Sequence, residues 1–456
     1  MSVARINGDG QVETACSIAF LTIDDSYGRM PDKCPNEVIP HILAALGDLP
    51  DRPGPLVWVY PFQEYHEMTF SKPARLQEPF FGDWFMRAAV NNGLPLCTVV
   101  STMNLVTSIC QFPGMYGESV LVTPAPDANS GVGSAVALDL CEYVQRGGQV
   151  LLYGPLDHTE RDLLEMLNLR LAEPIAGQLQ VDLRASPDRL SEGAYPRQLQ
   201  HREAMCAGGC REVLRDPADP HTQVVALVSQ GKQERVAAVV RRLPKWKGGA
   251  LAWVRGTNSN SYRGGHLLTP DDPQQWFQGD LLMRFTLDAL GYRVRFSKRV
   301  AEQRNPVLSI ARHENGFFLS GYTPDTTVEL RLRFPHGAPL LTGMETELTD
   351  GQAAYRLPRA WHRECRVLVD QPAGEISCVE QTGEEIGLRR RLRISGLKDA
   401  VVCFYPETRP GAPVNMQVDP KLPFIAGPFL DYQVHNDHQG HYLTAEHVSG
   451  TLLISW

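Results

Sequence analysis

Apolar and polar positions follow a regular order between residues 117 and 155. A short apolar run at Ser119–Pro124 leads into a turn rich in Pro, Asp, Asn, Ser and Gly, and an amphipathic segment follows at Val132–Arg146. Two glycines, Gly147 and Gly148, then precede a second apolar run at Val150–Tyr153. A buried strand, a loop, a helix, a glycine stop and another buried strand are the pattern of a βαβ crossover in a parallel sheet.

The helix of this unit is predicted with its two ends. Apolar residues recur at every fourth position and so lie along one helix face: Val132, Val136, Leu140 and Val144. Asn129 or Ser130 can accept a hydrogen bond from the first turn as the N-cap. The two glycines that follow can adopt the left-handed conformation that ends a helix.

The same alternation extends over the residues before this unit. Strands are predicted at Cys16–Ile23, Pro55–Tyr60 and Pro95–Ser101. Helices are predicted at Asn36–Leu46, Glu78–Asn92 and Thr102–Cys110. Strands that alternate with helices predict a doubly wound α/β domain with a mainly parallel sheet.

The pattern loosens after Tyr153. Glu160–Leu169 reads as a helix, whereas Ala172–Pro220 is polar and interrupted by Cys, Gly and Pro. Strand-like runs return further on: Gln223–Ser229, Arg235–Arg241 and Ala250–Arg255. We therefore predict that the α/β domain occupies residues 1–300, with an irregular insertion near residues 170–248 and a last helix at Trp276–Leu290.

After Asn305-Pro306 the sequence has the character of an all-β protein. Short apolar runs alternate with turn residues at even spacing: Leu308–Arg312, Gly316–Tyr322, Thr327–Phe334, Cys365–Asp370, Gly374–Glu380, Leu388–Ile394 and Ala400–Tyr405. This spacing predicts an antiparallel β-sandwich at residues 301–410. Residues 411–456 form a C-terminal extension whose apolar end, Thr451–Trp456, is expected to insert into a sheet.

Composition narrows the functional classes. A chain of 456 residues is long enough for two or three domains, and a formal net charge of −8 argues against a nucleic-acid or polyanion binder. The N-terminal stretch lacks a basic start followed by an apolar segment, so we expect a cytoplasmic protein without a cleaved signal. Its ten cysteines are scattered through predicted strands, helices and loops, and we interpret them as reduced thiols.

Ligands of a doubly wound sheet bind outside the carboxyl ends of its strands. The sequence places several polar residues there. The catalytic candidates are Asp24, Asp25, Glu64 and His66, in segments that begin DDSYG and QEYHE and are predicted to be loops. The candidates for ligand binding are Asn104, Asp127, Asp157, His158 and Tyr262, the last in a polar loop where its ring could stack on a sugar. A pair of carboxylates drawn from Asp24, Asp25 and Glu64 could do general acid and base work. The alternative is that the strand-end residues cap helices and solvate loops.

Motifs of other enzyme classes are missing or incomplete. Cys110 and Cys210 do not lie on a G-x-C-x-G elbow, and the Gly131-Val132-Gly133-Ser134 segment lacks the closing glycine of a nucleophile elbow or a dinucleotide fingerprint. A histidine-rich tail could suggest metal ligands: His435, Asp437, His438, His441 and His447. Because Asn, Gly and Thr flank them, we interpret this tail as a polar turn and predict neither a metal nor a cofactor.

Four segments together resemble a known domain. They are PLVWVYPFQEY, FFGDWFMRAAVNNGLPLCTVVST, SVLVTPAP and CEYVQRGGQVLLYGPL. Their order resembles the amidotransferase-like "trimerisation" domain of the family 42 β-galactosidases and their relatives, over about residues 15–300. In those glycoside hydrolases the domain follows a catalytic TIM barrel, lacks the amidotransferase cysteine and precedes a small β domain.

The resemblance implies a class I glutamine amidotransferase-like fold and a role in carbohydrate metabolism. The catalytic carboxylates of that family lie on the barrel, which needs about 250 residues of its own, so none is carried over to a position of this chain. It implies an accessory protein that acts in oligomerisation or shapes the sugar site of a barrel-bearing partner chain, and that is not catalytic alone. The alternative is a stand-alone saccharide hydrolase that uses the carboxylates at the strand ends.

Overall fold

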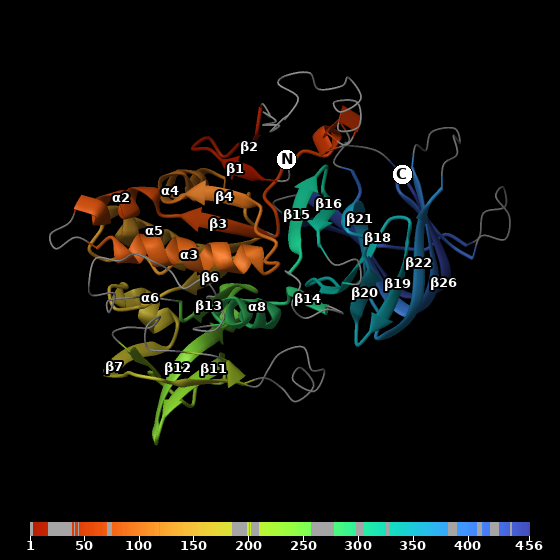
Figure 1. Cartoon of the computed structure of the whole chain (residues 1–456). Coiled ribbons are helices and arrows are strands. Elements are labelled where there is room, and N and C mark those ends of the chain that lie inside the picture. Colours follow the sequence, from red (N-terminus) through yellow and green to blue (C-terminus); the bar gives the residue numbers. More distant parts are fainter. Residues whose placement is uncertain are drawn as a thin grey trace, which may run out of the picture.

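The computed structural model describes residues 3–16, 39–40, 42–43, 45–70, 75–112, 114–117, 119–184, 198–199, 201, 209–256, 278–297, 305–324, 328–381, 390–407, 413–419, 428–437 and 440–456. Most of the regular structure in these residues is β. It is arranged as a large mixed sheet with helices and, beside it, a second sheet that is antiparallel (Figure 1).

The first sheet contains eleven strands in the order β2-β1-β4-β3-β5-β6-β13-β12-β11-β8-β9. Its first half consists of β1 (Ala4–Ile6), β2 (Val12–Thr14), β3 (Leu56–Tyr60), β4 (Thr98–Ser101), β5 (Val120–Pro124) and β6 (Gln149–Tyr153). Its second half consists of β8 (Gln180–Leu183), β9 (Gln198–Leu199), β11 (Thr222–Gln230), β12 (Gln233–Arg241) and β13 (Ala250–Val254). Neighbouring strands from β1 to β13 in this spatial order (β1-β4-β3-β5-β6-β13) pair in parallel. All other pairings in this sheet are antiparallel.

Helices cover both faces of the parallel part. They are α2 (Phe62–Phe70), α3 (Gln77–Asn91), α4 (Thr102–Gln111), α5 (Gly131–Gln145), α6 (Arg161–Met166) and α8 (Gly279–Ala289). One hydrophobic cluster packs α3 and α8 against one face, and another packs α4, α5 and α6 against the opposite face. The chain passes from β3 to β4 through α3, and then crosses back over β3 to β5 through α4. The strand order therefore reverses between β3 and β5.

The βαβ unit expected at residues 117–155 is confirmed as β5, α5 and β6, which pair in parallel register. Ser130 is the N-cap of α5 and accepts a hydrogen bond from the Gly133 amide. At the other end, the Gly147 amide donates to the Val144 carbonyl and the Gly148 amide to the Tyr143 carbonyl. With φ of +114° at Gly147, this is a Schellman motif, so both ends of the helix agree with the local sequence.

Two expectations for the first 300 residues need correction. The segment from Ala172 to Pro220 is not simply irregular, because β7 (Leu169–Ile175) and β10 (Cys210–Leu214) pair with each other and β8 and β9 join the first sheet. The sheet is consequently mixed rather than mainly parallel. Pattern reading missed these strands because they are short, and their exposed positions carry polar side chains. The predicted strand at Cys16–Ile23 lies, except for Cys16, outside the described residues.

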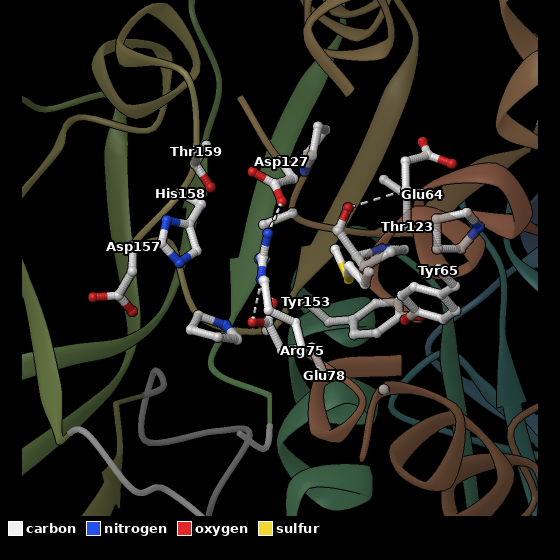
Figure 2. Close-up of a pocket in the computed structure, with 18 of the residues that line it drawn as sticks. Glu64, Tyr65, Arg75, Glu78, Thr123, Asp127, Tyr153, Asp157, His158 and Thr159 are labelled. Atoms are coloured by element: carbon white, nitrogen blue, oxygen red, sulfur yellow. Dashed lines mark hydrogen bonds and ion pairs between the residues drawn. The ribbon is translucent and has the colours of Figure 1, made fainter. Parts of the chain in front are cut away.

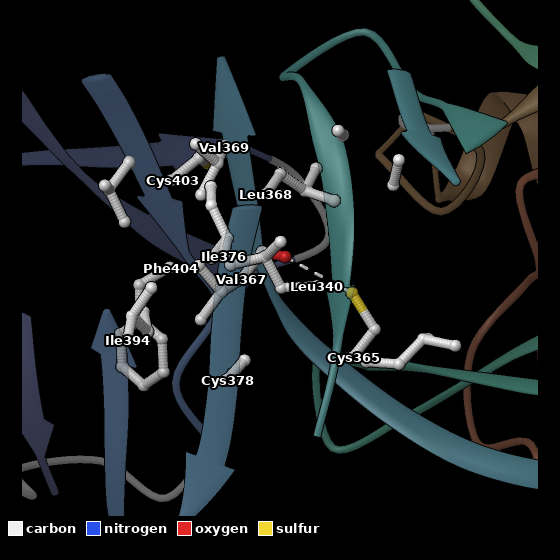
Figure 3. Close-up of a cluster of buried hydrophobic side chains, with 14 of the residues drawn as sticks. Leu340, Cys365, Val367, Leu368, Val369, Ile376, Cys378, Ile394, Cys403 and Phe404 are labelled. Carbon is white, nitrogen blue, oxygen red and sulfur yellow. Dashed lines mark hydrogen bonds between the residues drawn. The ribbon is translucent and has the colours of Figure 1, made fainter. Parts of the chain in front are cut away.

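The second sheet contains thirteen strands, and every pairing in it is antiparallel among the residues described. They are β14 (Arg293–Ser297), β15 (Val307–His313), β16 (Gly316–Tyr322), β17 (Glu329–Arg333), β18 (Ala338–Leu341), β19 (Met344–Thr349), β20 (Gln352–Arg356), β21 (Ala360–Asp370), β22 (Ala373–Glu380), β23 (Arg391–Phe404), β24 (Asn415–Val418), β25 (Gln433–Asp437) and β26 (Gly440–Ser455). One hydrophobic cluster contains side chains from both ends of this strand order and from strands between them. The sheet therefore curls around a single core. Figure 3 shows part of this core, with Cys365, Ile376, Ile394 and Phe404.

The C-terminal strand inserts into this sheet as expected, because β26 pairs with β23, β24 and β25. Two of the predicted runs, Leu388–Ile394 and Ala400–Tyr405, contribute to one long strand, β23. The helix-free character of residues 306–410 holds for the part that is described. The predicted domain boundary near residue 300 lies in the gap between β14 and β15, and β14 already pairs in the second sheet.

The two sheets are in contact. The Cys97 thiol, just before β4, donates a hydrogen bond to the Ile310 carbonyl on β15 at 2.8 Å. Asp288 on α8 is ion-paired to Arg293 and Arg295 on β14, at 2.8 and 3.1 Å, and all three side chains are buried or nearly so. The described helices include none that is long and apolar enough to cross a bilayer.

Candidate functional site

A cavity of about 380 Å³ lies at the carboxyl ends of β3, β5 and β6 (Figure 2). It sits where the strand order reverses, between β3 and β5. Residues at the ends of these strands or just after them line it, among them Thr123 in β5, Pro61 after β3 and Gly154 after β6. In open α/β sheets this reversal point opens a crevice because the chain leaves neighbouring strands toward opposite faces. The backbone topology therefore places the cavity at the usual ligand position of such sheets.

Glu64 is a buried carboxyl group in the wall of this pocket. It lies in α2, is 5% exposed, and accepts a hydrogen bond from the Thr102 hydroxyl at 2.8 Å. Burial, together with the nearby charges of Glu67 and Asp127, raises the pKa of Glu64 above its ordinary value, against the opposing effect of its hydrogen bonds. The sequence had suggested a polar loop at this position. The structure corrects this, because the polar QEYHE segment is helical and turns Glu64 inward.

Arg75 is held by two carboxylates in the same pocket. Its guanidinium forms a bidentate pair with Glu78, with both distances 2.6 Å, and its Nη1 lies 2.5 Å from Asp127 Oδ2. Asp127 also accepts hydrogen bonds from the backbone and side-chain amides of Asn129 at 2.9 Å. Burial alone would raise the pKa of Asp127, but the hydrogen bonds from Asn129 and Arg75 outweigh it and lower the pKa. Asp127 is thus ionised, and both of its carboxylate oxygens accept hydrogen bonds.

Asp157 and His158 follow β6 and form another side of the pocket (Figure 2). Asp157 pairs with Arg211 on β10 at 2.9 Å, and the Ala128 amide donates to the His158 carbonyl at 2.7 Å. The second of these bonds joins the loop after β6 to the loop that carries Asp127. The two strand-end loops are therefore braced against each other.

Aromatic side chains close the pocket near β3. Tyr153, at the end of β6, accepts a hydrogen bond from the Trp58 indole at 3.1 Å. Tyr65 on α2 lies close to α3, where the absence of a side chain at Gly82 makes room for it; a Cβ at Gly82 would meet the Tyr65 hydroxyl at 2.3 Å. Burial raises the pKa of Tyr65 well above its ordinary value. Burial raises the pKa of Tyr153 as well, so both phenols stay neutral.

The structure brings together some of the residues singled out in the sequence and separates others. Glu64, Asp127, Asp157 and His158 all line the pocket. Asn104 does not, because it lies on α4 and donates a hydrogen bond to the Ile6 carbonyl. His66 lines a neighbouring groove on the other side of Tyr65. Asp24, Asp25 and Tyr262 lie outside the described residues.

Sequence reasoning missed Arg75, Glu78 and Arg211. Arg75 and Glu78 are three residues apart where α3 begins, a spacing that favours an ion pair on a helix and could have been noticed. The contact between Arg75 and Asp127 joins residues 52 positions apart, and no local signal announces it. Arg211 comes from a strand that was not predicted.

The cysteines singled out in the sequence are not activated. Cys210 lies 3.9 Å from His201 in a buried cluster. Burial raises the pKa of the Cys210 thiol to about 11 and lowers the pKa of His201 to about 4, so both are neutral near pH 7. Cys110 is exposed on α4, and its pKa is also raised. A reactive cysteine needs the opposite shift, a thiolate stabilised near neutral pH.

Ser320, His362 and Asp48 have the hydrogen-bond connectivity of a nucleophilic triad. The Ser320 hydroxyl lies 2.5 Å from His362 Nδ1, and His362 Nε2 lies 2.9 Å from Asp48 Oδ2. Ser320 and His362 are cross-strand partners on β16 and β21, where the backbone amides are committed to the ladder. A catalytic triad also needs backbone amides that donate hydrogen bonds to the carbonyl oxygen of the substrate. It further needs a cavity for the substrate, and neither of the two larger cavities is lined by Ser320, His362 or Asp48. The cluster therefore reads as a contact that secures the segment around Asp48.

The tail histidines are spread over different contacts. His435 is hydrogen-bonded to the Thr444 hydroxyl and stacks on Tyr442, and His447 pairs with Asp399 at 2.9 Å. The side chain of Asp437 and the whole of His438 lie outside the described residues. The described part of the chain contains no group of three or more possible metal ligands.

The pocket as a whole is polar, acidic and partly lined by rings. Its lining includes four carboxyl groups and two guanidinium groups: Glu64, Glu78, Asp127, Asp157, Arg75 and Arg211. Three of the carboxylates are hydrogen-bonded to an arginine, and Glu64 is not among them. Apolar side chains such as Met68, Phe85 and Val136 complete the walls. Such a site suits a ligand with hydroxyl groups and no negative charge.

Comparison with known proteins adds little to this description. No protein-family model matches the chain, and no curated protein sequence matches it. Among solved structures, it is similar to an exo-β-1,4-mannosidase from Opitutaceae bacterium strain TAV5, with 12% sequence identity and a TM-score of 0.30. The alignment covers 52% of this chain and 36% of the mannosidase, so the chain spans about a third of that protein. A similarity this weak carries no argument about activity.

Proposed function

We propose that this chain is the accessory part of a carbohydrate-active protein and that the pocket between β3 and β5 binds a saccharide without hydrolysing it. The proposal rests on the pocket together with the sequence resemblance described above. A saccharide presents many hydroxyl groups and apolar ring faces. The pocket offers an acceptor at Glu64 and the rings of Tyr65 and Phe85. Arg75 supplies donors, because its guanidinium has N–H groups beyond the three that bond Glu78 and Asp127.

The pairing of the carboxylates is the observation that favours binding over catalysis. Glycoside hydrolysis needs two carboxyl groups about 5 to 10 Å apart across the sugar, one as acid and the other free to act as base or nucleophile. Glu64, with its raised pKa, has the character of the acid. Each of the other three carboxylates is hydrogen-bonded to a guanidinium, which lowers its basicity and its reactivity as a nucleophile. The pocket thus supplies a carboxyl group suited to act as the acid, Glu64, but, among the described residues that line it, no unpaired carboxylate suited to act as the base or nucleophile.

The same proposal covers fold family, partner and location. We infer a class I glutamine amidotransferase-like α/β domain, since the strand order β4-β3-β5-β6 with helices on both faces is compatible with it. The partner would be a barrel-bearing chain or further copies of this chain, in the cytoplasm, and the two braced strand-end loops would shape its sugar site. These points remain part of the proposal.

A stand-alone saccharide hydrolase is the second candidate. It is favoured by one observation, the opposite pKa shifts of Glu64 and Asp127 in a single pocket, since such pairs often mark an acid and its ionised partner. It requires Arg75 to leave Asp127 when substrate binds.

The decisive experiment measures both binding and turnover on the purified chain. We expect no hydrolysis of a panel of aryl glycosides, and saccharide binding detectable by calorimetry that is weakened about tenfold by Glu64→Gln, the effect of about one hydrogen bond. Glu142→Gln is the matched control, because Glu142 is an exposed carboxylate on α5 that does not line the pocket. Turnover that Glu64→Gln abolishes, with an unchanged circular dichroism spectrum, would establish the hydrolase instead.

A further inference from the structure

A second and more open cavity of about 620 Å³ lies beside the pocket, between α2 and α3. The residues that α2 contributes are spaced as i, i+3, i+4 and i+7 on one helix face: Phe62, Tyr65, His66 and Thr69. From α3, Phe80, Asp83 and Arg87 are spaced as i, i+3 and i+7, and Pro79 adjoins Phe80. These two helix faces form the walls of the groove, and among the described residues no other segment covers it.

Aromatic rings line this groove from end to end. Tyr60, at the end of β3, lies 5.7 Å from the Tyr65 ring in an edge-to-face arrangement and 6.5 Å from the Phe62 ring. Phe62 is 66% exposed, so its ring face is available to a ligand. Exposed rings in a concave surface are suited to stacking against the apolar faces of sugar rings.

Two polar groups of opposite formal charge stand among these rings without forming an ion pair with each other. Asp83 accepts a hydrogen bond from the Tyr60 hydroxyl at 3.0 Å. Arg87, one turn further along α3, is exposed, and no described residue forms an ion pair or hydrogen bond with it. An acceptor and a donor that are separate from each other can bind neighbouring hydroxyl groups of one sugar. Their charges cancel, so the groove favours a neutral ligand.

Tyr65 lines both this groove and the pocket. Its ring forms the partition between them, and Gly82 provides the space in which that ring sits. We propose that the α2/α3 groove is a second saccharide subsite and that the ligand of this chain is a neutral oligosaccharide. The terminal sugar of this ligand occupies the pocket. The next sugars pass over the Tyr65 ring and stack on the Phe62 ring in the groove. This inference rests on the proposed function and extends it from a single sugar to a chain of sugars. The separate polar groups and the continuity with the pocket favour a saccharide over a protein partner.

The test compares ligands of increasing length. We would titrate the full chain with glucose, galactose and mannose and with their β-1,4-linked di-, tri- and tetrasaccharides, using calorimetry. We expect the affinity in the preferred series to rise about tenfold from the monosaccharide to the trisaccharide, as one well-placed stacking contact would give. Phe62→Ala should remove most of this gain and leave the monosaccharide affinity unchanged.

Phe70→Ala is the matched control. Phe70 lies on the same helix, is 72% exposed, and does not line the groove. Equal affinities for all lengths, or an equal effect of the two substitutions, would overturn the subsite while leaving the pocket proposal intact. A change of oligomeric state on Phe62→Ala, seen by light scattering while sugar affinities stay the same, would assign the groove to a protein contact and likewise overturn the subsite. Failure of every sugar to bind would overturn the proposed function itself.

Discussion

Glu64 illustrates how strongly a single side chain depends on its surroundings. In the sequence it stands in a polar stretch, yet in the structure it is buried against Thr102 and faces the carboxylates of Glu67 and Asp127. A carboxyl group with a raised pKa keeps its proton in the folded state at pH values where the unfolded chain has lost it. Ionising it at neutral pH therefore costs folding free energy.

The first prediction concerns the pH dependence of stability. Because the pKa of Glu64 is raised in the folded state, the free energy of unfolding should fall as pH rises from the unfolded value of 4.5 through the folded pKa. Glu64→Gln cannot ionise and can still accept a hydrogen bond from Thr102. We expect the variant to be more stable than the wild type at pH 7, with the difference shrinking toward pH 4.5. Urea unfolding across this range measures it, and a difference that grows at acidic pH would contradict the prediction.

The second prediction concerns the thiols. Cys210 is buried with a pKa raised to about 11, and Cys110 is exposed but also has a raised pKa. Neither is a nucleophile in this structure, so Cys110→Ala and Cys210→Ala should leave saccharide binding within twofold of the wild type. Iodoacetamide at pH 7 should modify no thiol far ahead of the others. One cysteine that reacts much faster, together with loss of function, would reopen an amidotransferase-type mechanism.

At the scale of elements, α5 connects the local sequence to the pocket. Its N-terminal turn is packed against the loop that carries Asp127, and a Cβ at Gly133 would lie 2.2 Å from the Asp127 carbonyl oxygen. A Cβ at Gly131, two residues earlier on the same helix, would meet nothing within 4 Å. Gly133 therefore permits close packing of α5 against the Asp127 loop, whereas a side chain at Gly131 would contact nothing.

The third prediction uses this pair. Gly133→Ala should destabilise the protein by about 2 to 3 kcal/mol, because the backbone of the Asp127 loop has to move. Gly131→Ala should be neutral or stabilise by up to about 1 kcal/mol through the lower entropy of the unfolded chain. Guanidinium unfolding compares them. We also expect Gly133→Ala to weaken saccharide binding and Gly131→Ala to leave it unchanged; similar effects of both would show that the Asp127 loop is not held by this contact.

At the scale of the whole molecule, the two sheets share elements across their boundary. Helix α8 packs on the first sheet, and β14, which follows it, pairs with β17 in the second sheet. Asp288 at the end of α8 binds both Arg293 and Arg295 of β14 in a buried network. Removing one member of such a network leaves buried charges without a partner.

The fourth prediction is that this network couples the unfolding of the two parts. Asp288→Asn should lower the free energy of unfolding by about 3 to 5 kcal/mol. Calorimetry should show one transition shifted to lower temperature, with the wild type also unfolding in one transition. Asp399→Asn, in the exposed pair with His447, is the control and should change stability by less than about 1 kcal/mol. If Asp288→Asn shifted only part of the transition, the two sheets would be independent folding units.

The sequence by itself determined the local elements of this protein. β3, β5, β6 and the antiparallel strands β15, β16 and β22 follow from runs of buried residues, and both ends of α5 follow from Ser130 and Gly147. These features depend on periodicity, capping and turn chemistry within a few residues, which is information that a short stretch of chain contains.

Only the tertiary structure decided which of the candidate residues belong together. The QEYHE segment of α2 has the polar sequence of a loop, and only the burial of Glu64 shows its inward face. That burial depends on α4 and on the Asp127 loop. Arg75 reaches Asp127 across 52 positions of sequence. β8 joins the first sheet by pairing with β11, and β9 by pairing with β8. Contacts of this kind follow from the order of strands in the sheet, which no local pattern encodes, so the pocket emerges only when the chain is folded.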